Sequence, residues 1–192
     1  MSFPRSDEQR ELVNTIAKLL AERADPLPPS WETVEAGVDR SLWQSLAELG
    51  LLGVGVSEEQ GGSGGGLREL CLLAERVGAA CARIPFVGTA AVLAAGAPDV
   101  SRIVNGSVIA VPAWETLPGL PGTRRDALSL SGPRVEGALQ AVAFGMDADL
   151  LLAFAGDTAI FLDLDQPWVR RRSMREEGRH RAAGAGWRRR IR

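Results

Sequence analysis

The sequence predicts an α+β fold, in which an N-terminal α-helical bundle is followed by an antiparallel β domain and an irregular basic tail. Two observations predict this. Apolar residues recur at three- and four-residue spacing through the first half, which is typical of amphipathic helices. From about residue 107 the apolar runs become short and are separated by glycine- and proline-containing turns, which is typical of strands. Helices first and strands second favour segregated elements over alternating βαβ units.

The first predicted helix spans about 6–24. Ser6 and Gln9 have the spacing of a capping box, in which each side chain bonds the backbone of the other residue. Behind them apolar residues follow helical spacing: Leu12, Val13, Ile16, Leu19 and Leu20. The stretch DPLPPS at 25–30 ends the helix, because proline has no backbone N–H to continue the ladder.

Three further helices are predicted over 40–49, 67–84 and 87–96. The first has one apolar stripe, and Gly50 suits the position after its C-cap. The stretch LLGVGVS at 51–57 is apolar and punctuated by glycine, so we expect a buried connector. The last of the three helices is rich in small apolar residues, which is typical of helices packed tightly inside a bundle.

The second half contains a series of candidate strands with turn residues between them. They span 107–113, 127–132, 134–139, 141–145, 149–155 and 158–164, and a last candidate at 168–172 breaks off without a partner. We therefore expect a helical domain over 1–105, a β domain over 106–170 and an arginine-rich tail over 171–192.

Charge is distributed unevenly along the chain. The formal net charge is −2, but the stretch from Arg170 to Arg192 holds ten arginines and two glutamates. The rest of the chain is therefore acidic. Clustered arginines indicate a nucleic-acid or anionic-membrane contact. A shifted reading frame in GC-rich DNA also yields such a stretch, and the broken strand pattern near Arg170 favours that interpretation.

Several classes of protein are disfavoured. His180 is the only histidine, which argues against a His-based metal site or a Ser-His-Asp triad. No apolar run approaches the roughly 20 residues of a membrane span. The charged start MSFPRSDEQRELV lacks an apolar signal core, so we expect a cytoplasmic protein. Cys71 and Cys81 are expected as small buried apolar side chains in that reducing compartment.

The stretch GVSEEQGGSGGG at 55–66 resembles a phosphate-binding loop at first sight. A P-loop, however, ends in Gly-Lys-Ser/Thr, and the only lysine here is Lys18. The spacing of Gly61, Gly64 and Gly66 does not match the dinucleotide fingerprint, and the flanking segments are helical rather than a strand and a helix. We therefore interpret these glycines as a turn that lets two helices approach closely.

The stretch LWQSLAELGLLGVGVSEEQGGSGGGLRELCLLAERVGAACARIPF at 42–86 resembles the N-terminal helical domain of the acyl-CoA dehydrogenase family. That family has a tryptophan-containing helix, a Gly-Leu-Leu-Gly turn and a Pro-Glu-Glu-Tyr-Gly-Gly-like loop. Ser57 and Gln60 stand where the family has Pro and Tyr. The resemblance implies that the loop turns beneath an acyl-binding bundle and that the next helix lines the fatty-acyl pocket. The expected substrate-binding residues are Leu67, Leu70 and Cys71.

The β half resembles the middle domain of the same family over 106–119 and 139–155. The resemblance implies FAD as the cofactor. Trp114-Glu115-Thr116 stand at the family's Thr-Glu-Pro, and residues 141–144 stand at a Trp-Ile-Thr-Asn-type strand that packs on the flavin. The expected cofactor-binding residues are Trp114, Glu115, Thr116, Ala143 and Phe144. The loss of the Trp and the Thr removes a stacking surface and a hydroxyl donor. Asp149 keeps the family's aspartate, which we expect to cap or turn the chain.

The implied function is that of an FAD-dependent acyl-CoA dehydrogenase, which introduces a trans α,β double bond into an acyl-CoA thioester. The family's base is a glutamate in a C-terminal helical domain that follows the β domain, and no acid here corresponds to it. Glu58, Glu59 and Glu115 are typical of solvated turn acids. No catalytic residue and no metal ligand is therefore assigned, and we expect no activity from the chain alone. The implied partners are acyl-CoA, dehydrogenase subunits in a homo- or hetero-oligomer and an electron-transfer acceptor.

Three other functions stay open. The chain is a candidate for a non-catalytic partner subunit whose flavin site is completed by another chain. It is also a candidate for an interaction protein that keeps only the bundle fold. As a third alternative, the arginine-rich tail would bind nucleic acid with strong salt dependence. No membrane contact is expected, and nucleic acid is the least favoured partner because few aromatic residues accompany the arginines.

Overall fold

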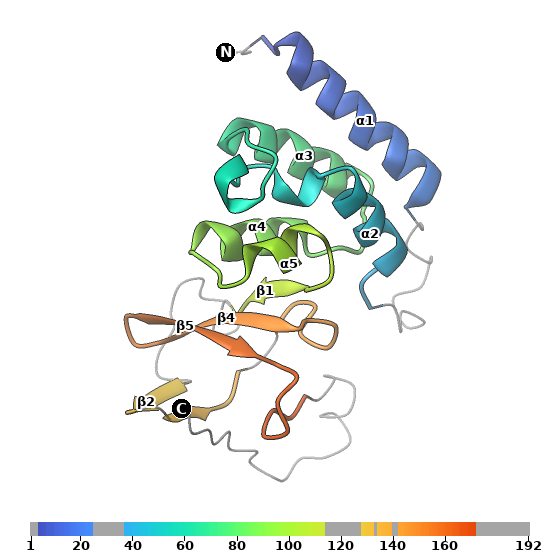
Figure 1. The fold of residues 1–192 in the computed structure, drawn as a ribbon. Helices are drawn as coiled ribbons and strands as arrows, with labels where there is room; N and C mark the ends of the chain where they lie inside the picture. The colour runs from blue at the N-terminus through green and yellow to red at the C-terminus, as the bar shows by residue number, and fades with distance from the viewer. Residues whose placement is uncertain (1–3, 25–36, 114–127, 133, 140–141, 172–192) are drawn as a thin grey trace. The chain divides into compact units, whose positions relative to one another are not determined.

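The protein is described by a computed structural model, which defines residues 4–24, 37–113, 128–132, 134–139 and 142–171. The chain divides into two compact units, Met1–Val108 and Ile109–Arg192. The described elements of the first unit are helices, and those of the second are strands (Figure 1). The α+β class predicted from the sequence is therefore confirmed. The predicted basic tail at 171–192 lies outside the described residues, except for Arg171.

Helix α1 spans Asp7–Arg23, as predicted. Its capping box is present, because Ser6 Oγ accepts from Gln9 N at 3.1 Å and Gln9 Oε1 accepts from Ser6 N at 3.1 Å. This pair satisfies two backbone donors that the first turn of a helix otherwise leaves without partners. The buried residues Val13, Ile16 and Leu20 form one face of the helix. The proline-rich stretch 25–30 lies outside the described residues.

Helix α2 spans Arg40–Glu48, and its N-cap Asp39 accepts a hydrogen bond from Leu42 N at 2.9 Å. Gly50 follows the C-cap with φ +70°, the left-handed conformation that glycine adopts without steric cost. The 3-10 helix η2 (Leu51–Gly53) is buried. Val54 and Val56 are buried as well. The predicted helix and the buried connector are both confirmed.

Helix α3 spans Leu67–Ala79 and ends earlier than the predicted residue 84. Its end is a Schellman motif, because Cys81 N donates to Gly78 O at 3.0 Å and Ala82 N donates to Val77 O at 3.1 Å. Cys81 occupies the left-handed position with φ +48°, where glycine is the usual residue. The turn therefore ends the helix before the proline that follows.

The prediction that both cysteines are buried was wrong, because Cys71 and Cys81 are exposed free thiols. Cys71 lies on the face of α3 opposite to its buried residues, Leu73 and Val77. Cys81 lies in the turn after the helix, where the backbone conformation and not apolar burial decides its place. Helical spacing alone does not reveal either effect.

Helix α4 spans Phe86–Ala94, as predicted, and α5 spans Val100–Val104. The sequence did not predict α5, because its five residues are too few to show a helical period and its N-cap Asp99 makes no side-chain capping bond. Within this unit α3 packs against α1 and α4. Among the described residues, no helix has both the length and the apolar character needed to cross a membrane.

The second unit contains a three-stranded sheet in the order β1-β4-β5, with β4 in the centre (Figure 1). Strands β4 (Leu150–Ala155) and β5 (Thr158–Asp163) form an antiparallel hairpin, and β1 (Ala110–Pro112) pairs with β4 in parallel. A separate antiparallel pair consists of β2 (Leu128–Ser131) and β3 (Arg134–Gly137). The parallel β1–β4 pair is the exception to the predicted antiparallel arrangement.

Two predicted strands are not strands. The described part of 141–145 forms a turn, in which Gly145 N donates to Val142 O at 3.1 Å and Asp147 N donates to Phe144 O at 3.0 Å. Local hydrogen bonds therefore replace ladder bonds at this apolar run. The described residues of 168–172 also lie outside any strand, and Val169 N donates back to Gln166 O at 2.9 Å.

The strained end of α3 gives a stability prediction. Cys81→Gly should raise the free energy of unfolding of the helical unit by about 1 kcal/mol, because glycine adopts positive φ without a Cβ clash. Urea unfolding followed by far-UV circular dichroism measures the change. Cys81→Ala is the matched control, since it removes the thiol and keeps the strain. An equal gain from the alanine variant would show that the thiol and not the backbone is responsible.

Candidate functional site

The glycine-rich stretch of the first unit is a loop closed by its own backbone. Val54 and Gly64 form an isolated parallel β-bridge, and Gly55 N donates to Gly64 O at 2.8 Å. Further amides donate within the loop: Gly61 N to Glu58 O, Gly62 N to Ser57 O, Ser63 N to Gly53 O and Gly64 N to Val56 O. These amides already have acceptors. They therefore cannot converge on a phosphate in the way that a P-loop requires.

The elements on either side of this loop also differ from those of a nucleotide site. The 3-10 helix η2 precedes it and α3 follows it, so no strand leads into the turn. At the start of α3, Gly66 N donates to Glu69 Oε2 at 2.9 Å. A carboxylate of the chain itself thus occupies the place that an anion takes at a helix N-terminus. The predicted turn between helical segments is confirmed.

Two glycines permit close approaches within this loop. A Cβ added to Gly62 would lie 2.3 Å from Val56 O, and a Cβ added to Gly55 would lie 2.6 Å from Leu70 Cδ1. Real Cβ atoms do not approach that closely, so neither position accepts a larger residue without a shift. Gly62 allows the two arms of the loop to touch, and Gly55 allows the first turns of α3 to pack on the loop.

Glu69 joins this loop to α1. Its Oε1 accepts from Gln9 Nε2 at 2.6 Å, so one carboxylate bridges α1 and the first turn of α3. The Gln9 hydrogen bond, followed by the backbone amides of Glu69 and Gly66, lowers the pKa of Glu69. A carboxylate with a lowered pKa is a weak proton acceptor, which disfavours Glu69 as a catalytic base. From the sequence, Gln9 was predicted only as a cap, and the spacing of Gly66 and Glu69 signals only the bond between those two residues.

The structure brings the three predicted acyl-binding residues together. Leu67, Leu70 and Cys71 are spaced by three and four residues on α3 and therefore share one face. The Leu67 side chain is 77% exposed, Cys71 is exposed and Leu70 is half-buried against the loop. This face of α3 therefore presents apolar side chains that the helical unit does not cover.

The predicted flavin residues are only partly described. Trp114, Glu115 and Thr116 lie outside the described residues. Ala143 is exposed in the turn that replaces the predicted strand, and Phe144 is half-buried there with φ +58°. A methyl group and a phenyl ring offer no hydrogen bond to the polar edge of a flavin, and the amides of Gly145, Asp147 and Ala148 donate within the turn. The described side chains alone therefore do not fit FAD.

Asp149 stabilises the junction of the three-stranded sheet. Its Oδ2 accepts from Ile109 N at 2.8 Å, and its backbone N donates to Ile109 O at 2.8 Å. Leu164 N, just after β5, donates to Asp149 O at 2.8 Å. These bonds support the structural role expected for this aspartate. In the described parts of both units, no group of three or more His, Cys, Asp or Glu side chains is arranged to hold a metal ion.

Comparison with known proteins identifies the family. The model of the acyl-CoA dehydrogenase N-terminal domain matches residues 6–101, which run from α1 to the start of α5 and include the glycine loop. The chain belongs to the acyl-CoA dehydrogenase family. The resemblance noted from the tryptophan helix, the loop and α3 is therefore confirmed.

Curated relatives are named as CoA dehydrogenases and are longer than this chain. Benzylmalonyl-CoA dehydrogenase of Aromatoleum aromaticum is 29% identical over 143 residues, which are 74% of this chain and 37% of that protein. Acyl-CoA dehydrogenase IpdE2 of Mycobacterium tuberculosis is 33% identical over 112 residues, which are 54% of this chain and 35% of that protein. The chain thus spans about a third of the length of these acyl-CoA dehydrogenase relatives.

Solved structures show the same fold. A variant of the Tcur3481–Tcur3483 steroid ACAD has a TM-score of 0.69 at 28% identity, and the match covers 84% of this chain and 49% of that chain. The ChsE4–ChsE5 complex from Mycobacterium tuberculosis has a TM-score of 0.68 at 22% identity, with 88% and 50% covered. At that lower identity the second match supports the acyl-CoA dehydrogenase fold alone.

The closed loop gives a prediction about Gly62. Gly62→Ala should lower the free energy of unfolding by about 2–3 kcal/mol, because the added methyl group collides with the Val56 carbonyl and forces the two arms apart. Gly61→Ala is the comparison variant, because Gly61 has positive φ and open space around it, whereas Gly62 does not have positive φ. We expect about half the loss for the control, measured by urea unfolding. A loss for Gly62→Ala no larger than the loss for Gly61→Ala would show that the close approach to Val56 O is not the larger constraint.

The Glu69 bridge gives a prediction about acid stability. Because folding lowers the pKa of Glu69, the stabilisation is present above its ordinary value of 4.5 and is lost as pH falls through the lowered folded value. Glu69→Gln keeps a hydrogen-bonding group of the same shape and cannot ionise. This variant should therefore show a smaller loss of unfolding free energy as the pH falls from above 4.5 through the lowered folded-state pKa. Carboxyl-carbon NMR titration measures the Glu69 pKa directly, and an unshifted value would contradict the bridge.

Proposed function

We propose that the chain is the acyl-binding and flavin-contacting part of an FAD-dependent acyl-CoA dehydrogenase, which introduces a trans α,β double bond into an acyl-CoA thioester. The observation that supports this most strongly is the family match over 6–101. Within that range, α3 presents an exposed apolar face next to the glycine loop. That face is suited to a hydrocarbon chain, because the burial of apolar groups drives such binding.

In this proposal the residues of α3 divide into two groups. Leu67, Leu70 and Cys71 contact the hydrocarbon part of the thioester. Glu69 does not touch the ligand and instead holds the first turn of α3 against the loop and α1 through Gly66 N and Gln9 Nε2. This bridge fixes the position of the three apolar side chains relative to the loop. The contribution of the helical unit is this open apolar face, from which a bound hydrocarbon chain would exclude water.

FAD, when bound, supplies the acceptor for the hydride that leaves the β-carbon. Trp114, Glu115 and Thr116 are the proposed contacts of this chain, together with the backbone at Ala143 and Phe144. Because the described side chains alone do not fit a flavin, we propose that the site is completed, and the base supplied, by residues outside these described ranges or by a partner subunit. We expect no dehydrogenase activity from residues 1–192 alone, and an electron-transfer acceptor is a further proposed partner of the complete enzyme.

Oligomeric partners are supported by the comparisons. Both solved structures described above are named for two proteins, as the Tcur3481–Tcur3483 steroid ACAD and the ChsE4–ChsE5 complex. The same observation favours a second candidate function, that of a non-catalytic partner subunit in a heteromeric acyl-CoA dehydrogenase. In that case the chain stabilises the active subunit and does not touch the acyl group. We propose the cytoplasm as its compartment, since Cys71 and Cys81 are exposed free thiols that suit a reducing environment.

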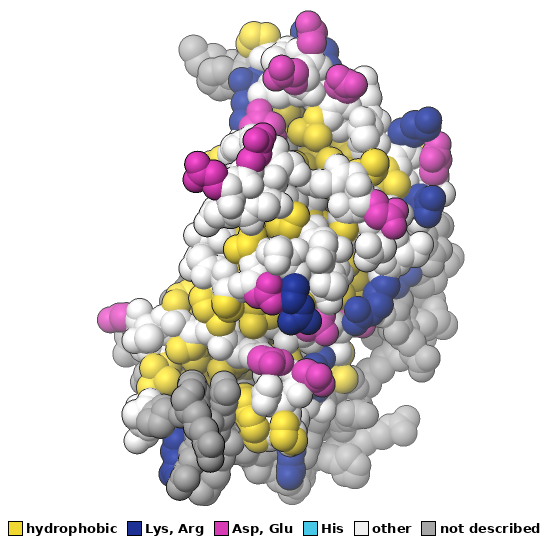
Figure 2. Space-filling model, viewed as in Figure 1, with side chains coloured by type: hydrophobic (Ala, Val, Ile, Leu, Met, Phe, Trp, Pro, Cys, Tyr) yellow, Lys and Arg dark blue, Asp and Glu magenta, His cyan; other side chains and the backbone are white. Residues whose placement is uncertain are grey.

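A nucleic-acid function has little support from the described residues. On the face drawn in Figure 2, lysine and arginine side chains are interspersed with aspartate and glutamate and do not gather into a basic patch. The arginine-rich stretch that suggested this function lies almost entirely outside the described residues. The hypothesis that this stretch results from a shifted reading frame is tested by sequencing the gene, where an intact helical frame downstream would support it.

Acyl-CoA binding tests the proposed role of α3. Leu67→Glu should weaken the binding of octanoyl-CoA at least tenfold, because the burial of one leucine contributes about 1.5–3 kcal/mol. Leu49→Glu is the matched control, since Leu49 is also an exposed leucine, at 51%, but lies at the end of α2. Isothermal titration calorimetry measures both constants. Equal effects of the two variants would remove α3 from the acyl site.

The flavin absorbance spectrum distinguishes the two candidate functions. A yellow complex with a partner subunit, together with octanoyl-CoA binding to this chain, supports the catalytic proposal. A yellow complex in which Leu67→Glu leaves turnover unchanged supports the non-catalytic subunit. A colourless chain that binds neither acyl-CoA nor a dehydrogenase subunit contradicts both.

A further inference from the structure

Strand β5 forms an edge of the three-stranded sheet in the second unit. Its register with β4 runs from Ala155↔Thr158 at the turn to Leu150↔Asp163, and among the described strands only β4 pairs with it. A two-residue turn that begins with Gly156 at φ +57° closes the hairpin. The opposite side of β5 is therefore a row of backbone groups without a neighbouring strand in the described part of the unit.

The phase of the ladder determines which groups these are. In an antiparallel pair, alternate residues of a strand direct their N–H and C=O groups towards the partner. Leu164 N donates to Asp149 O, so the even-numbered residues of this segment face β4. The two-residue turn requires the same phase at Thr158. The backbone groups of Ala159, Phe161 and Asp163 therefore point away from β4, along the outer edge.

This edge lacks the usual protection against pairing. Natural proteins block exposed edges with lysine, proline or β-bulges. The run Thr158–Leu162 contains no proline and no charged residue, and its register with β4 has no bulge. Thr158, Ala159 and Asp163 are exposed, and Phe161 is half-buried. An edge of this length with such side chains is suited to the addition of a strand.

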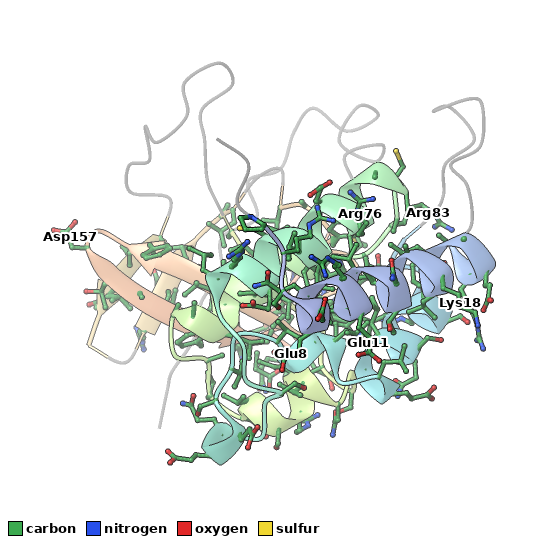
Figure 3. The ribbon with its side chains drawn as sticks, turned by 90° about the horizontal axis from the view of Figure 1, so that it is seen from above. Glu8, Glu11, Lys18, Arg76, Arg83 and Asp157 are labelled. Atoms are coloured by element: carbon green, nitrogen blue, oxygen red, sulfur yellow. The ribbon has the colours of Figure 1, made fainter. Side chains whose placement is uncertain are left out.

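Charge restricts the identity of the added strand. Exposed acids lie at both ends of the edge, with Asp157 at the hairpin turn (Figure 3) and Asp163 and Asp165 at the other end. A second copy paired antiparallel about Phe161 would place Asp157 opposite Asp165 of that copy, and like charges directly opposite destabilise a pair. A segment with basic residues at both ends places opposite charges there instead.

We propose that the outer edge of β5 is a docking site for an extended segment of a partner protein that has β-branched or apolar residues in its middle and arginine or lysine at both ends. The segment adds a strand next to β5 and bonds the outward groups of Ala159, Phe161 and Asp163. Arginine or lysine at its ends pairs with Asp157, Asp163 and Asp165. This inference is independent of the acyl-CoA chemistry proposed above.

Peptide binding to the full chain tests the proposal. The probe is the synthetic peptide Arg-Thr-Val-Thr-Val-Thr-Arg, and its control has glutamate in place of both arginines. Fluorescence anisotropy should show about tenfold tighter binding of the arginine peptide, since opposite charges attract at both ends of the edge and glutamate would be repelled there. NMR hydrogen exchange should show new protection at the amides of Ala159, Phe161 and Asp163. The amides of Ile160 and Leu162 should be protected with and without peptide.

A proline variant separates docking from folding. Ala159→Pro removes an outward N–H and leaves the bonds to β4 in place, as edge strands tolerate proline there. The variant should lose peptide binding and keep the exchange protection of Ile160 and Leu162, whereas Ala159→Ser should behave like the parent chain. If the proline variant also loses that protection, Phe161→Lys is the second variant. It should weaken binding of the arginine peptide, because the added lysine and the peptide arginines are both positive.

Four outcomes would overturn the proposal. Protection of the outward amides in the free, dilute chain would show that the chain itself covers the edge. Protection that rises with protein concentration in the absence of peptide would identify a second copy as the occupant. Equal affinity for both peptides would show that the acids do not select the partner. No binding of either peptide at millimolar concentration would leave the edge without a docking function.

Discussion

The close contact between Gly62 and the Val56 carbonyl is the constraint on which the helical unit depends. It allows the two arms of the glycine loop to bond each other, and this closure sets the distance between η2 and the start of α3. Leu70 then rests on Gly55, and Glu69 reaches both Gly66 and Gln9. The position of the exposed apolar face of α3 therefore follows from backbone atoms that pack without side chains between them.

Membership of the acyl-CoA dehydrogenase family gives this geometry a chemical context. The loop has the glycine content of a phosphate site, yet its amides are committed to its own carbonyls and a glutamate occupies the helix N-terminus. Glycine here serves close packing and not ligand contact. Glycine-rich loops therefore serve phosphate binding in some proteins and close packing in this one. The hydrogen-bond partners of the loop amides distinguish the two cases.

Local sequence signals predicted most of the helices, because caps and helical periods act over a few residues. Ser6 with Gln9 defined the start of α1, and Gly50 defined the end of α2. The Gln9–Glu69 bond joins residues 60 apart, so no local pattern revealed that Gln9 has two roles. The end of α3 was missed because cysteine, and not glycine, occupies the left-handed position.

In the second unit, apolar composition alone did not separate strands from turns. The described part of 141–145 is mostly apolar, as β4 is, but its backbone bonds within a turn, and the parallel partner of β4 lies about 40 residues away along the chain. For the candidate site, the three α3 residues were placed on one face as expected from their spacing. The flavin contacts could not be placed by the same reasoning, because they depend on residues outside the described ranges and on the conformation of a turn.

The Asp149 bridge to Ile109 has a consequence for the order of folding. Strands β4 and β5 are joined by a two-residue turn and can pair early. Pairing of β1 requires closure of a loop of 40 residues before Ile109 N can donate to the Asp149 carboxylate. The entropy lost in closing such a loop slows that step relative to hairpin formation. We therefore expect β1 to join the sheet last, and the bond from Ile109 N to the Asp149 carboxylate to form at that step.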